Sequence, residues 1–245
     1  GVSEGCYSSL NLSFTRGDKE EAVRENFRRI GESIGVNSED MVFTQQTHTT
    51  NVRVVTDEER GMGILRPRGY SDVDGLVTNV PGICLVTFFA DCVPLYFVDP
   101  VKRTIGLSHS GWRGTVGKIG KVTVELMQEE YGSNPADILA AIGPSICREC
   151  YEVSEDVIEQ FREHFDENSW KHLFYRKDNG KYQLDLWKAN EIIFREAGIL
   201  KENIAVTNLC THCNSEALFS HRTMGDRRGN MCAFLALQAE KGKKI

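Results

Sequence analysis

Residues 88–114, FFADCVPLYFVDPVKRTIGLSHSGWRG, contain the strands around which we expect the fold to form. The apolar runs 93–98 and 104–109 are joined by a short polar turn, as in two neighbouring antiparallel strands. Cys92 follows an aspartate just before the first run, and His109 ends the second. A buried structural thiol needs no charged neighbour, whereas a metal ligand or a nucleophile often has one. This stretch therefore predicts both a sheet and a chemical site at its edge.

Strand-like and helical patterns continue on both sides of this stretch. Apolar runs typical of strands lie at 41–46, 51–56, 74–79, 83–90, 93–99, 104–110, 137–143, 203–208 and 231–237. Apolar residues recur with helical spacing at 18–35, 114–132, 154–165 and 185–198. We expect the runs 83–89, 93–98 and 104–109 to form a meander, because short turns join them. The blocks of strands and helices favour an α+β fold with helices outside one or two mixed sheets.

Three of the predicted helices carry a residue suited to cap the helix start. Asp18 and Glu21 have the spacing of a capping box, and Ser154 and Asp185 are preferred N-cap types. Gly198 is expected to stop the last helix.

Composition narrows the possible classes of protein. The 245 residues suit one domain covering 1–245. A net charge of −6 argues against a nucleic-acid or acidic-membrane partner, since both need a basic face. No apolar run has the length of a membrane span. The chain has eight cysteines and no recognisable export signal, so we expect reduced thiols or metal ligands and a cytoplasmic location.

Three segments place a metal-binding side chain where a predicted strand ends. TQQTHTTNV carries His48, FFADC carries Cys92 and GLSHSGWRG carries His109. Cys92 and His109 are 17 residues apart, which suits neighbouring strands whose ends meet. Two imidazoles and a thiolate form a suitable ligand set for zinc, with a fourth position left for water or substrate. We therefore predict a zinc site at these residues.

The segment SGWRG, residues 110–114, predicts a second kind of chemistry beside the metal site. It runs into a predicted helix, and backbone N–H groups at a helix start favour an anion. Arg113 could hold that anion with two hydrogen bonds, so phosphate is the expected guest. Trp112 could stack on a base, although packing against the protein is the commoner role.

Two C-x-x-C pairs, CREC at 147–150 and CTHC at 210–213, raise a further possibility. Four thiolates could form a structural zinc site, which would suggest a binding module. The 59 intervening residues far exceed the roughly 15–20 of compact zinc ribbons. We therefore expect these cysteines to be core thiols near the candidate site.

Six segments carry a family resemblance: YSSLNLSF, QTHTTNV, FFADCVPLYF, SHSGWRG, IGPSICRECYEVSEDV and LFSHR. They resemble the successive motifs of the YfiH/laccase-domain family, also called the polyphenol oxidoreductase family. The resemblance implies phosphorolysis of adenosine, inosine and methylthioadenosine to free base and a ribose 1-phosphate type product, with adenosine deaminase activity besides. It implies zinc bound by His48, Cys92 and His109. The implied fold is a four-layer α/β/β/α sandwich related to the cytotoxic necrotizing factor deamidase.

The chain departs from the family pattern in places. Thr49, Ser110, Thr223 and Asn230 stand where the family usually has glycine, alanine, arginine and arginine. Arg222 matches the first arginine of the C-terminal motif, and Arg227 or Arg228 could compensate for the missing ones.

Within this interpretation we name Cys92, His109, Arg113 and Asp91 as catalytic residues. Zinc would polarise a phosphate oxygen or supply the water that attacks purine C6. Asp91 would serve as acid/base or orient a ligand, or it would simply hold the turn. Substrate-binding roles are expected for Asn11, Gln45, Arg113 and Arg222. Each of Asn11, Gln45 and Arg222 has a structural alternative, namely a turn, a strand edge and a surface ion pair.

The same residues would also suit other enzyme classes. A cysteine hydrolase or deamidase would use Cys92 as nucleophile and His109 as base, which leaves His48 without a role. A copper oxidase needs many histidines, largely in His-x-His pairs, because imidazole is its main copper ligand. The chain has six histidines and no such pair, so this class is rejected. The partners expected are purine nucleosides and phosphate, and the oligomeric state is not assigned.

Overall fold

The computed structural model describes residues 1–238, and its largest sheet is built around the predicted hairpin. In spatial order the six strands are Ile204–Val206 (β11), Leu139–Ile142 (β7), Val93–Asp99 (β5), Thr104–Ser110 (β6), Gly75–Thr78 (β3) and Val52–Val54 (β2). β5 and β6 are antiparallel along their whole length. The outer pairs β2–β3 and β7–β11 are parallel, so the sheet is mixed.

A second sheet contains the strand that precedes the hairpin. Its strands are Met41–Phe43 (β1), Cys84–Phe89 (β4) and Met231–Ala236 (β12), with β4 in the middle. The prediction of one meander is therefore wrong for β4. β12, from the far end of the chain, pairs with all of β4, and β1 takes the other edge. Asp91, in the left-handed region at φ 85°, turns the chain from β4 into β5.

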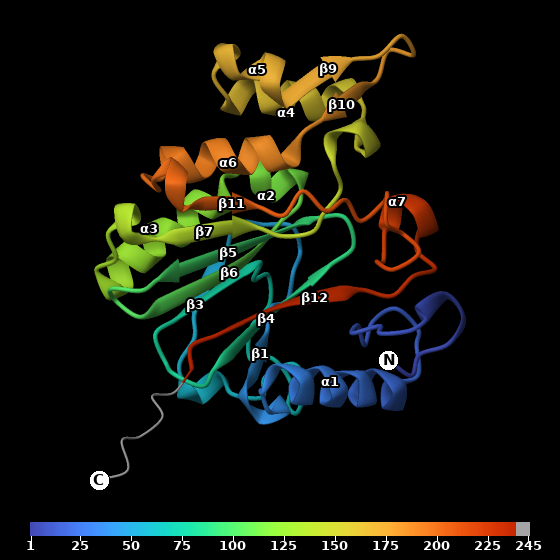
Figure 1. The fold of residues 1–245 in the computed structure, drawn as a ribbon, viewed down its shortest axis with the longest axis vertical. Coiled ribbons are helices and arrows are strands. Elements are labelled where there is room, and N and C mark those ends of the chain that lie inside the picture. Colours follow the sequence, from blue (N-terminus) through green and yellow to red (C-terminus); the bar gives the residue numbers. More distant parts are fainter. Residues whose placement is uncertain (239–245) are drawn as a thin grey trace.

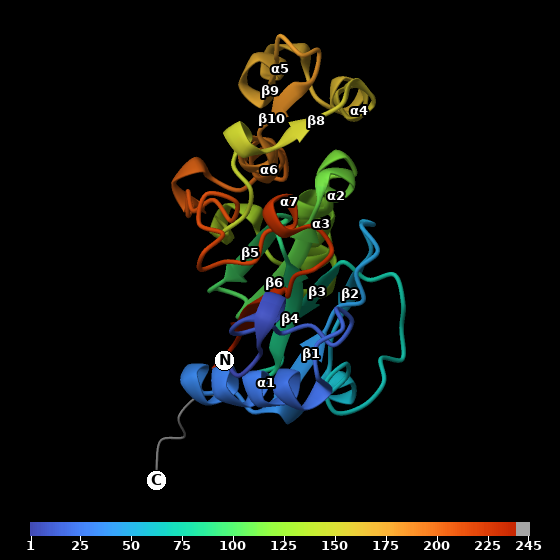
Figure 2. The same cartoon turned by 90° about the vertical axis from the view of Figure 1, so that its right-hand side faces the viewer.

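The two sheets pack against each other and are covered by helices on their outer faces (Figures 1 and 2). Trp112–Val116 (α2), Ile119–Tyr131 (α3) and Leu186–Glu196 (α6) cover the larger sheet. Glu20–Ile34 (α1) covers the smaller one, with the Phe27 ring 5.0 Å from that of Phe43. Leu85 and Phe89 of β4 share an apolar core with Leu107 of β6. An α+β fold with mixed sheets is confirmed.

The helix predicted over 114–132 is two helices, α2 and α3. The break falls at Gly117 and Lys118, and Lys118 has a left-handed φ of 57°. A Cβ at Gly117 would lie 2.5 Å from Thr50 Cγ2, so glycine allows the loop before β2 to approach here. Val116 of α2 and Ile119, Val124 and Met127 of α3 share one apolar core, which is why the apolar recurrence looked continuous across the break.

The predicted helix starts have mixed outcomes. Asp185 caps α6 as expected, accepting a hydrogen bond from the backbone N–H of Lys188. Ser154 occupies the N-cap of Glu155–His164 (α4), but its side chain makes no capping bond. The capping box at Asp18 is wrong, because Lys19 is the N-cap of α1. The carboxylate of Asp18 instead accepts hydrogen bonds from Ser3 and Asn11.

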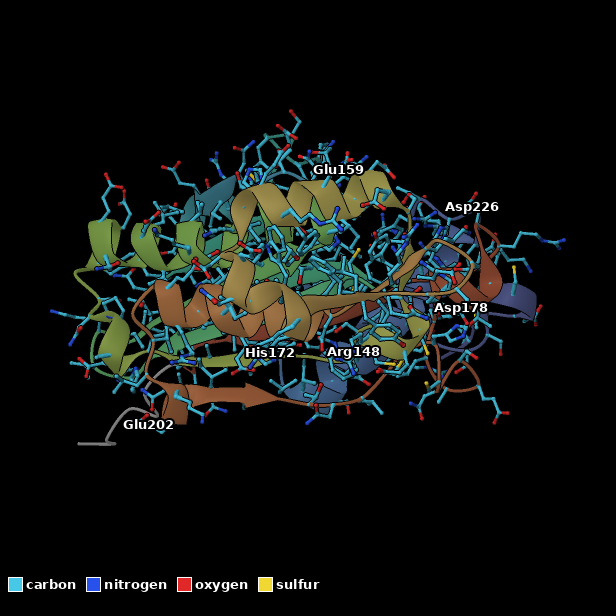
Figure 3. All side chains as sticks on the ribbon, turned by 90° about the horizontal axis from the view of Figure 1, so that it is seen from above. Arg148, Glu159, His172, Asp178, Glu202 and Asp226 are labelled. Atoms are coloured by element: carbon cyan, nitrogen blue, oxygen red, sulfur yellow. The ribbon has the colours of Figure 1, made fainter. Side chains whose placement is uncertain are left out.

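The residues that lie between β7 and β11 in the sequence form a small sheet that was not predicted. It comprises Glu152–Val153 (β8), Tyr182–Leu184 (β10) and Phe174–Arg176 (β9), and Glu167–Leu173 (α5) lies beside it. These strands are too short to show alternation in the sequence. Seen from above in Figure 3, Glu159 on α4 and Asp178 in the β9–β10 turn mark its outer surface. A short helix, His221–Met224 (α7), precedes β12.

Within residues 1–238, no helix is both long enough and apolar enough to cross a bilayer.

Candidate active site

The three predicted metal ligands converge where the two sheets meet. His48 lies in the loop after β1, Cys92 lies between β4 and β5, and His109 is in β6. Their ligand atoms all lie within 4.8 Å of one another. The two imidazole rings stand edge to face, with centroids 5.0 Å apart. His109 is buried and His48 is exposed, so the cluster is open on the side of His48.

A buried aspartate that sequence reasoning missed holds both histidines. Nδ1 of His109 donates to Oδ1 of Asp74 at 2.8 Å. The same carboxylate accepts the backbone N–H groups of Thr47, His48 and Thr49 at 2.9, 3.1 and 3.1 Å. The loop wraps so tightly around it that His48 adopts a left-handed φ of 67°. With Nδ1 occupied, Nε2 of His109 is the atom available to a metal.

The charges in the cluster favour the thiolate form of Cys92. Burial raises the pKa of this thiol, but His109 and His48 outweigh burial and lower the pKa to about 6. Burial lowers the pKa of His109, but Cys92 and Asp74 outweigh it and raise the pKa to about 9. Thiolate is the form of cysteine that binds metals and attacks electrophiles.

The absence of a side chain at Gly111 leaves room for His48 and Cys92. A Cβ on this residue would lie 2.9 Å from Cδ2 of His48 and 3.2 Å from Sγ of Cys92. The glycine between His109 and α2 thus brings the backbone against His48 and Cys92, two candidate ligands that a side chain would displace. Two imidazole nitrogens and a thiolate, all within reach of one ion, fit zinc as a borderline-soft metal.

A cavity of about 320 Å³ lies directly over the cluster. Its walls come from the N-terminal segment, the loop after β1, the loop between β2 and β3, the end of β4 and the segment before β12. The three candidate ligands form its floor. The other lining residues are Ser13, Phe14, Thr15, Arg16, Thr44, Gln45, Gln46, Arg68, Phe88, Ala90, Arg228 and Asn230. The volume falls within the range of small-molecule sites, roughly 300–1,000 Å³.

Three arginines in the cavity wall have unsatisfied donors. The Nε atoms of Arg16, Arg68 and Arg228 are buried and have no hydrogen-bond partner among residues 1–238. Burial and the neighbouring Arg16 lower the pKa of Arg228. Buried donors without partners are costly, so an anion is the guest that would satisfy them.

Residues 1–238 match the family model described as multi-copper polyphenol oxidoreductase laccase. The chain belongs to this family. The family resemblance of the sequence motifs is thereby confirmed, and the geometry of this laccase-family chain can be set beside that of its relatives.

Relatives of the chain carry names of purine enzymes. "Purine nucleoside phosphorylase YlmD" of Bacillus subtilis is 37% identical over 239 residues, covering 97% of this chain and 85% of that protein. "Adenosine deaminase RL5", from an unknown prokaryotic organism, is 36% identical over 226 residues, covering 91% and 85%. The crystal structure of the hypothetical protein YfiH of Bacillus licheniformis has a TM-score of 0.93 at 37% identity, covering 97% and 89%.

Two of the predicted substrate residues have different positions in this laccase-family chain. Gln45 lines the cavity. Asn11 is completely buried and does not line it. Its amide oxygen accepts the backbone N–H groups of Ser13 and Asn230, each at 3.0 Å, and both of these residues do line it. Asn11 therefore shapes the cavity wall from behind.

Asp91 ties three segments together beside the cluster. Its carboxylate accepts hydrogen bonds from the hydroxyl of Thr211 and the backbone N–H of Arg222, both at 2.6 Å. Its carbonyl accepts the N–H of Ile146 at 3.0 Å. Asp74, not Asp91, is the carboxylate that orients a candidate metal ligand, His109, and Asp91 fixes the turn before Cys92.

Arg113 and Arg222 do not line the cavity. Arg113 is exposed and lies over the Trp112 ring, with 4.3 Å between guanidinium and ring centroid. The guanidinium of Arg222 lies 5.4 Å from the ring centroid of Tyr151 and donates to the carbonyl of Glu152. Sequence reasoning missed Arg16, which lies just after the motif YSSLNLSF, and Arg68, whose segment carried no motif. It named Arg228 only as a possible compensating residue.

The two C-x-x-C pairs also come together. The sulfurs of Cys147, Cys150, Cys210 and Cys213 lie within 4.8 Å of one another, and only Cys210 is buried. The prediction that all four are core thiols is therefore wrong. The two pairs are far apart in the sequence because the residues between them form the small sheet and its helices, and this separation hid their closeness in space.

Proposed function

We propose that this chain is a zinc-dependent purine nucleoside phosphorylase that also deaminates adenosine. The observation that carries the proposal is one cavity whose floor is the His48, Cys92 and His109 cluster. Its wall holds three arginines whose Nε donors have no partner in the described part of the chain. The names of the relatives point to the same two activities. The substrates proposed are adenosine, inosine and methylthioadenosine, with phosphate as co-substrate.

His48, Cys92 and His109 would hold the zinc ion, and Asp74 would keep Nε2 of His109 directed at it. Bound zinc supplies a Lewis acid and lowers the pKa of a water at its open position. The wrapped loop of residues 47–49 fixes His48 on the cavity side. Cys92 contributes its thiolate as a ligand, which ties up its nucleophilic sulfur.

Phosphate is assigned to Arg16, Arg68 and Arg228. Phosphorolysis passes through an oxocarbenium-like state, so positioning of the anionic nucleophile and stabilisation of charge are the main requirements. The planar guanidinium can donate two hydrogen bonds to one phosphate, and all three arginines face the same cavity. These residues take over the phosphate role that the sequence suggested for Arg113.

The nucleoside is assigned to the remaining cavity wall. Phe14 and Phe88 offer ring faces for the purine. Gln46 uses its amide to hold the backbone of Phe88, donating to its carbonyl and accepting from its N–H. Among residues 1–238, the Gln45 side chain makes no such bond, so we assign its amide to the purine edge. Asp91 is proposed as a positioning residue, since both of its carboxylate oxygens are occupied.

Incubation of the purified protein with adenosine, with and without phosphate, tests the proposal by chromatography of the products. We expect adenine and ribose 1-phosphate only when phosphate is present. Inosine should form in both cases, and with phosphate part of it should be cleaved further to hypoxanthine. Removal of zinc with a chelator should abolish both reactions, and added zinc should restore them. A chelated protein that still cleaves adenosine at the full rate would refute the proposal.

A cysteine hydrolase or deamidase is the second candidate, favoured by the Asp74–His109–Cys92 arrangement. The carboxylate orients the imidazole, and the imidazole lowers the pKa of the thiol, as a nucleophilic cysteine requires. For the fold itself we propose the four-layer α/β/β/α description and a relation to the cytotoxic necrotizing factor deamidase, which the family resemblance implies. Such a relation to a deamidase would suit this second candidate. Rapid alkylation of Cys92 in zinc-loaded protein would favour it over the phosphorylase.

We also propose a cytoplasmic location. All eight cysteines are free. Free thiols in such number, several of them close together, fit a reducing compartment.

A further inference from the structure

A second group of potential metal ligands lies outside the cavity, at the two C-x-x-C loops. The four sulfurs lie within 4.8 Å of one another, and those of Cys150 and Cys213 are 3.4 Å apart. Four thiolates around one zinc, at Zn–S of about 2.3 Å, would be separated by about 3.8 Å. The observed sulfur–sulfur distances, 3.4 Å for the pair above and no more than 4.8 Å for the others, lie on both sides of this value. Small movements of the side chains would therefore complete a tetrahedron.

The fold brings the two loops together through the parallel pair β7 and β11. Ile142, the last residue of β7, pairs with Val206, the last of β11. Because parallel strands end at the same edge of a sheet, both chains leave in the same direction, as Figure 1 shows. A further parallel bridge between Ser145 and Cys210 keeps them aligned up to the cysteines.

The backbone around the sulfurs is arranged for negative charge. The N–H groups of Cys147 and Cys213 donate to Sγ of Cys210, at 3.3 and 3.4 Å. In the first loop the N–H of Cys150 donates to the carbonyl of Cys147, which closes a tight turn and places both sulfurs on one side. Hydrogen bonds of this kind orient and stabilise metal-bound thiolates.

We propose that Cys147, Cys150, Cys210 and Cys213 bind a second zinc ion in a closed structural site. Thiolates are soft ligands, and a tetrahedral set of four sulfurs is typical of structural zinc. Four protein ligands leave no open position for water or substrate. The role of this site would therefore be structural, whereas the three-ligand cluster under the cavity keeps an open position for chemistry.

The second site also positions a ligand of the first. Ile146, next to Cys147, donates its N–H to the carbonyl of Asp91. Thr211, next to Cys210, donates its hydroxyl to the carboxylate of Asp91 at 2.6 Å. Asp91 is the left-handed residue of the turn that ends in Cys92. A zinc ion that joins the two loops would hold this turn from both sides.

Metal counting on the full chain tests the second site directly. Elemental analysis and native mass spectrometry should find about two zinc ions per wild-type chain and about one in Cys92→Ala, where only the four-cysteine site remains. The Cys150→Ser/Cys213→Ser variant should also retain about one, and the control Cys6→Ser about two. Cys92→Ala loaded with cobalt alone should show the intense absorption of a tetrahedral tetrathiolate. This test does not depend on whether the double variant folds.

Several outcomes would overturn the second site. The first two are a Cys92→Ala chain without zinc and an unchanged number of zinc ions in the double variant. The others are iron bound in place of zinc, or an intact protein mass lower by two hydrogens because Cys150 and Cys213 form a disulfide. Loss of phosphorolysis would not alter these counts, so failure of the proposed function is distinguishable. In the double variant, chelator competition should show roughly 10- to 100-fold weaker zinc binding at the first site. Unchanged affinity would overturn the positioning role.

Discussion

Asp74 is completely buried and accepts a hydrogen bond from Nδ1 of His109 at 2.8 Å. It also accepts the backbone N–H groups of residues 47–49. One carboxylate thus fixes the ring of one candidate ligand and the loop that carries another. The orientation of the site depends on a residue that touches neither the cavity nor the metal position.

Asp74→Asn tests this dependence. An amide offers one acceptor oxygen where the carboxylate offers two, so some of the buried donors lose their partner. We expect roughly 10- to 100-fold weaker zinc binding and a free energy of unfolding lower by about 1–3 kcal/mol. Chelator competition and denaturant titration measure the two effects. The control is Asp72→Asn, whose carboxylate, within residues 1–238, accepts hydrogen bonds from the side chains of Thr47 and Asn51 alone. Equal zinc affinity in both variants would contradict the assigned role.

The reactivity of Cys92 should depend on pH in a characteristic way. Its pKa is lowered to about 6, so in chelated protein the thiolate forms as the pH rises through about 6, and alkylation should accelerate there. Burial raises the pKa of Cys84 to about 12, so that thiol should stay unreactive over the same range. Peptide mass spectrometry after timed iodoacetamide treatment resolves the two. Zinc-loaded protein should react slowly at Cys92 throughout, and a midpoint near that of an ordinary thiol would argue against this environment.

Removal of a cavity arginine should weaken phosphate binding selectively. We expect Arg16→Ala and Arg228→Lys to raise the KM for phosphate by roughly 10- to 100-fold, because hydrogen bonds to charged groups contribute about 1.5–3 kcal/mol. The KM for adenosine should change far less. Arg113→Ala is the matched control, since Arg113 lies outside the cavity. If Arg113→Ala has the larger effect, phosphate binds at the start of α2, as the sequence suggested.

Gly111→Ala should remove zinc from the first cluster without unfolding the chain. The backbone φ of Gly111 is −74°, which alanine tolerates, but the new methyl would lie against His48 and Cys92. We expect one zinc fewer per chain and a nearly unchanged melting temperature. In Gly69→Ala the nearest atom to the added methyl is 3.8 Å away, so this control should keep its zinc. Full zinc content in Gly111→Ala would show that the cluster has more room than the structure indicates.

Features that carry a sequence motif were largely predictable, and contacts between distant segments without a motif were not. His109 and Cys92 meet because β5 and β6 form a short hairpin, and a hairpin can be recognised from adjacent runs. Asp74 reaches His109 through the pairing of β3 with β6, for which no motif exists. The C-x-x-C loops meet across 63 residues. β4 was placed in the wrong sheet because its partner β12 comes from the other end of the chain.

The late position of β12 has a consequence for biosynthesis. Until Met231–Ala236 is available, the edge of β4 from Cys84 to Phe89 lacks its antiparallel partner. An unpaired apolar edge is a template for pairing with another chain. Nascent or prematurely terminated chains that stop before β12 are therefore the species most exposed to aggregation. Emergence of residues 231–236 from the ribosome is the step that gives β4 its partner and protects these chains.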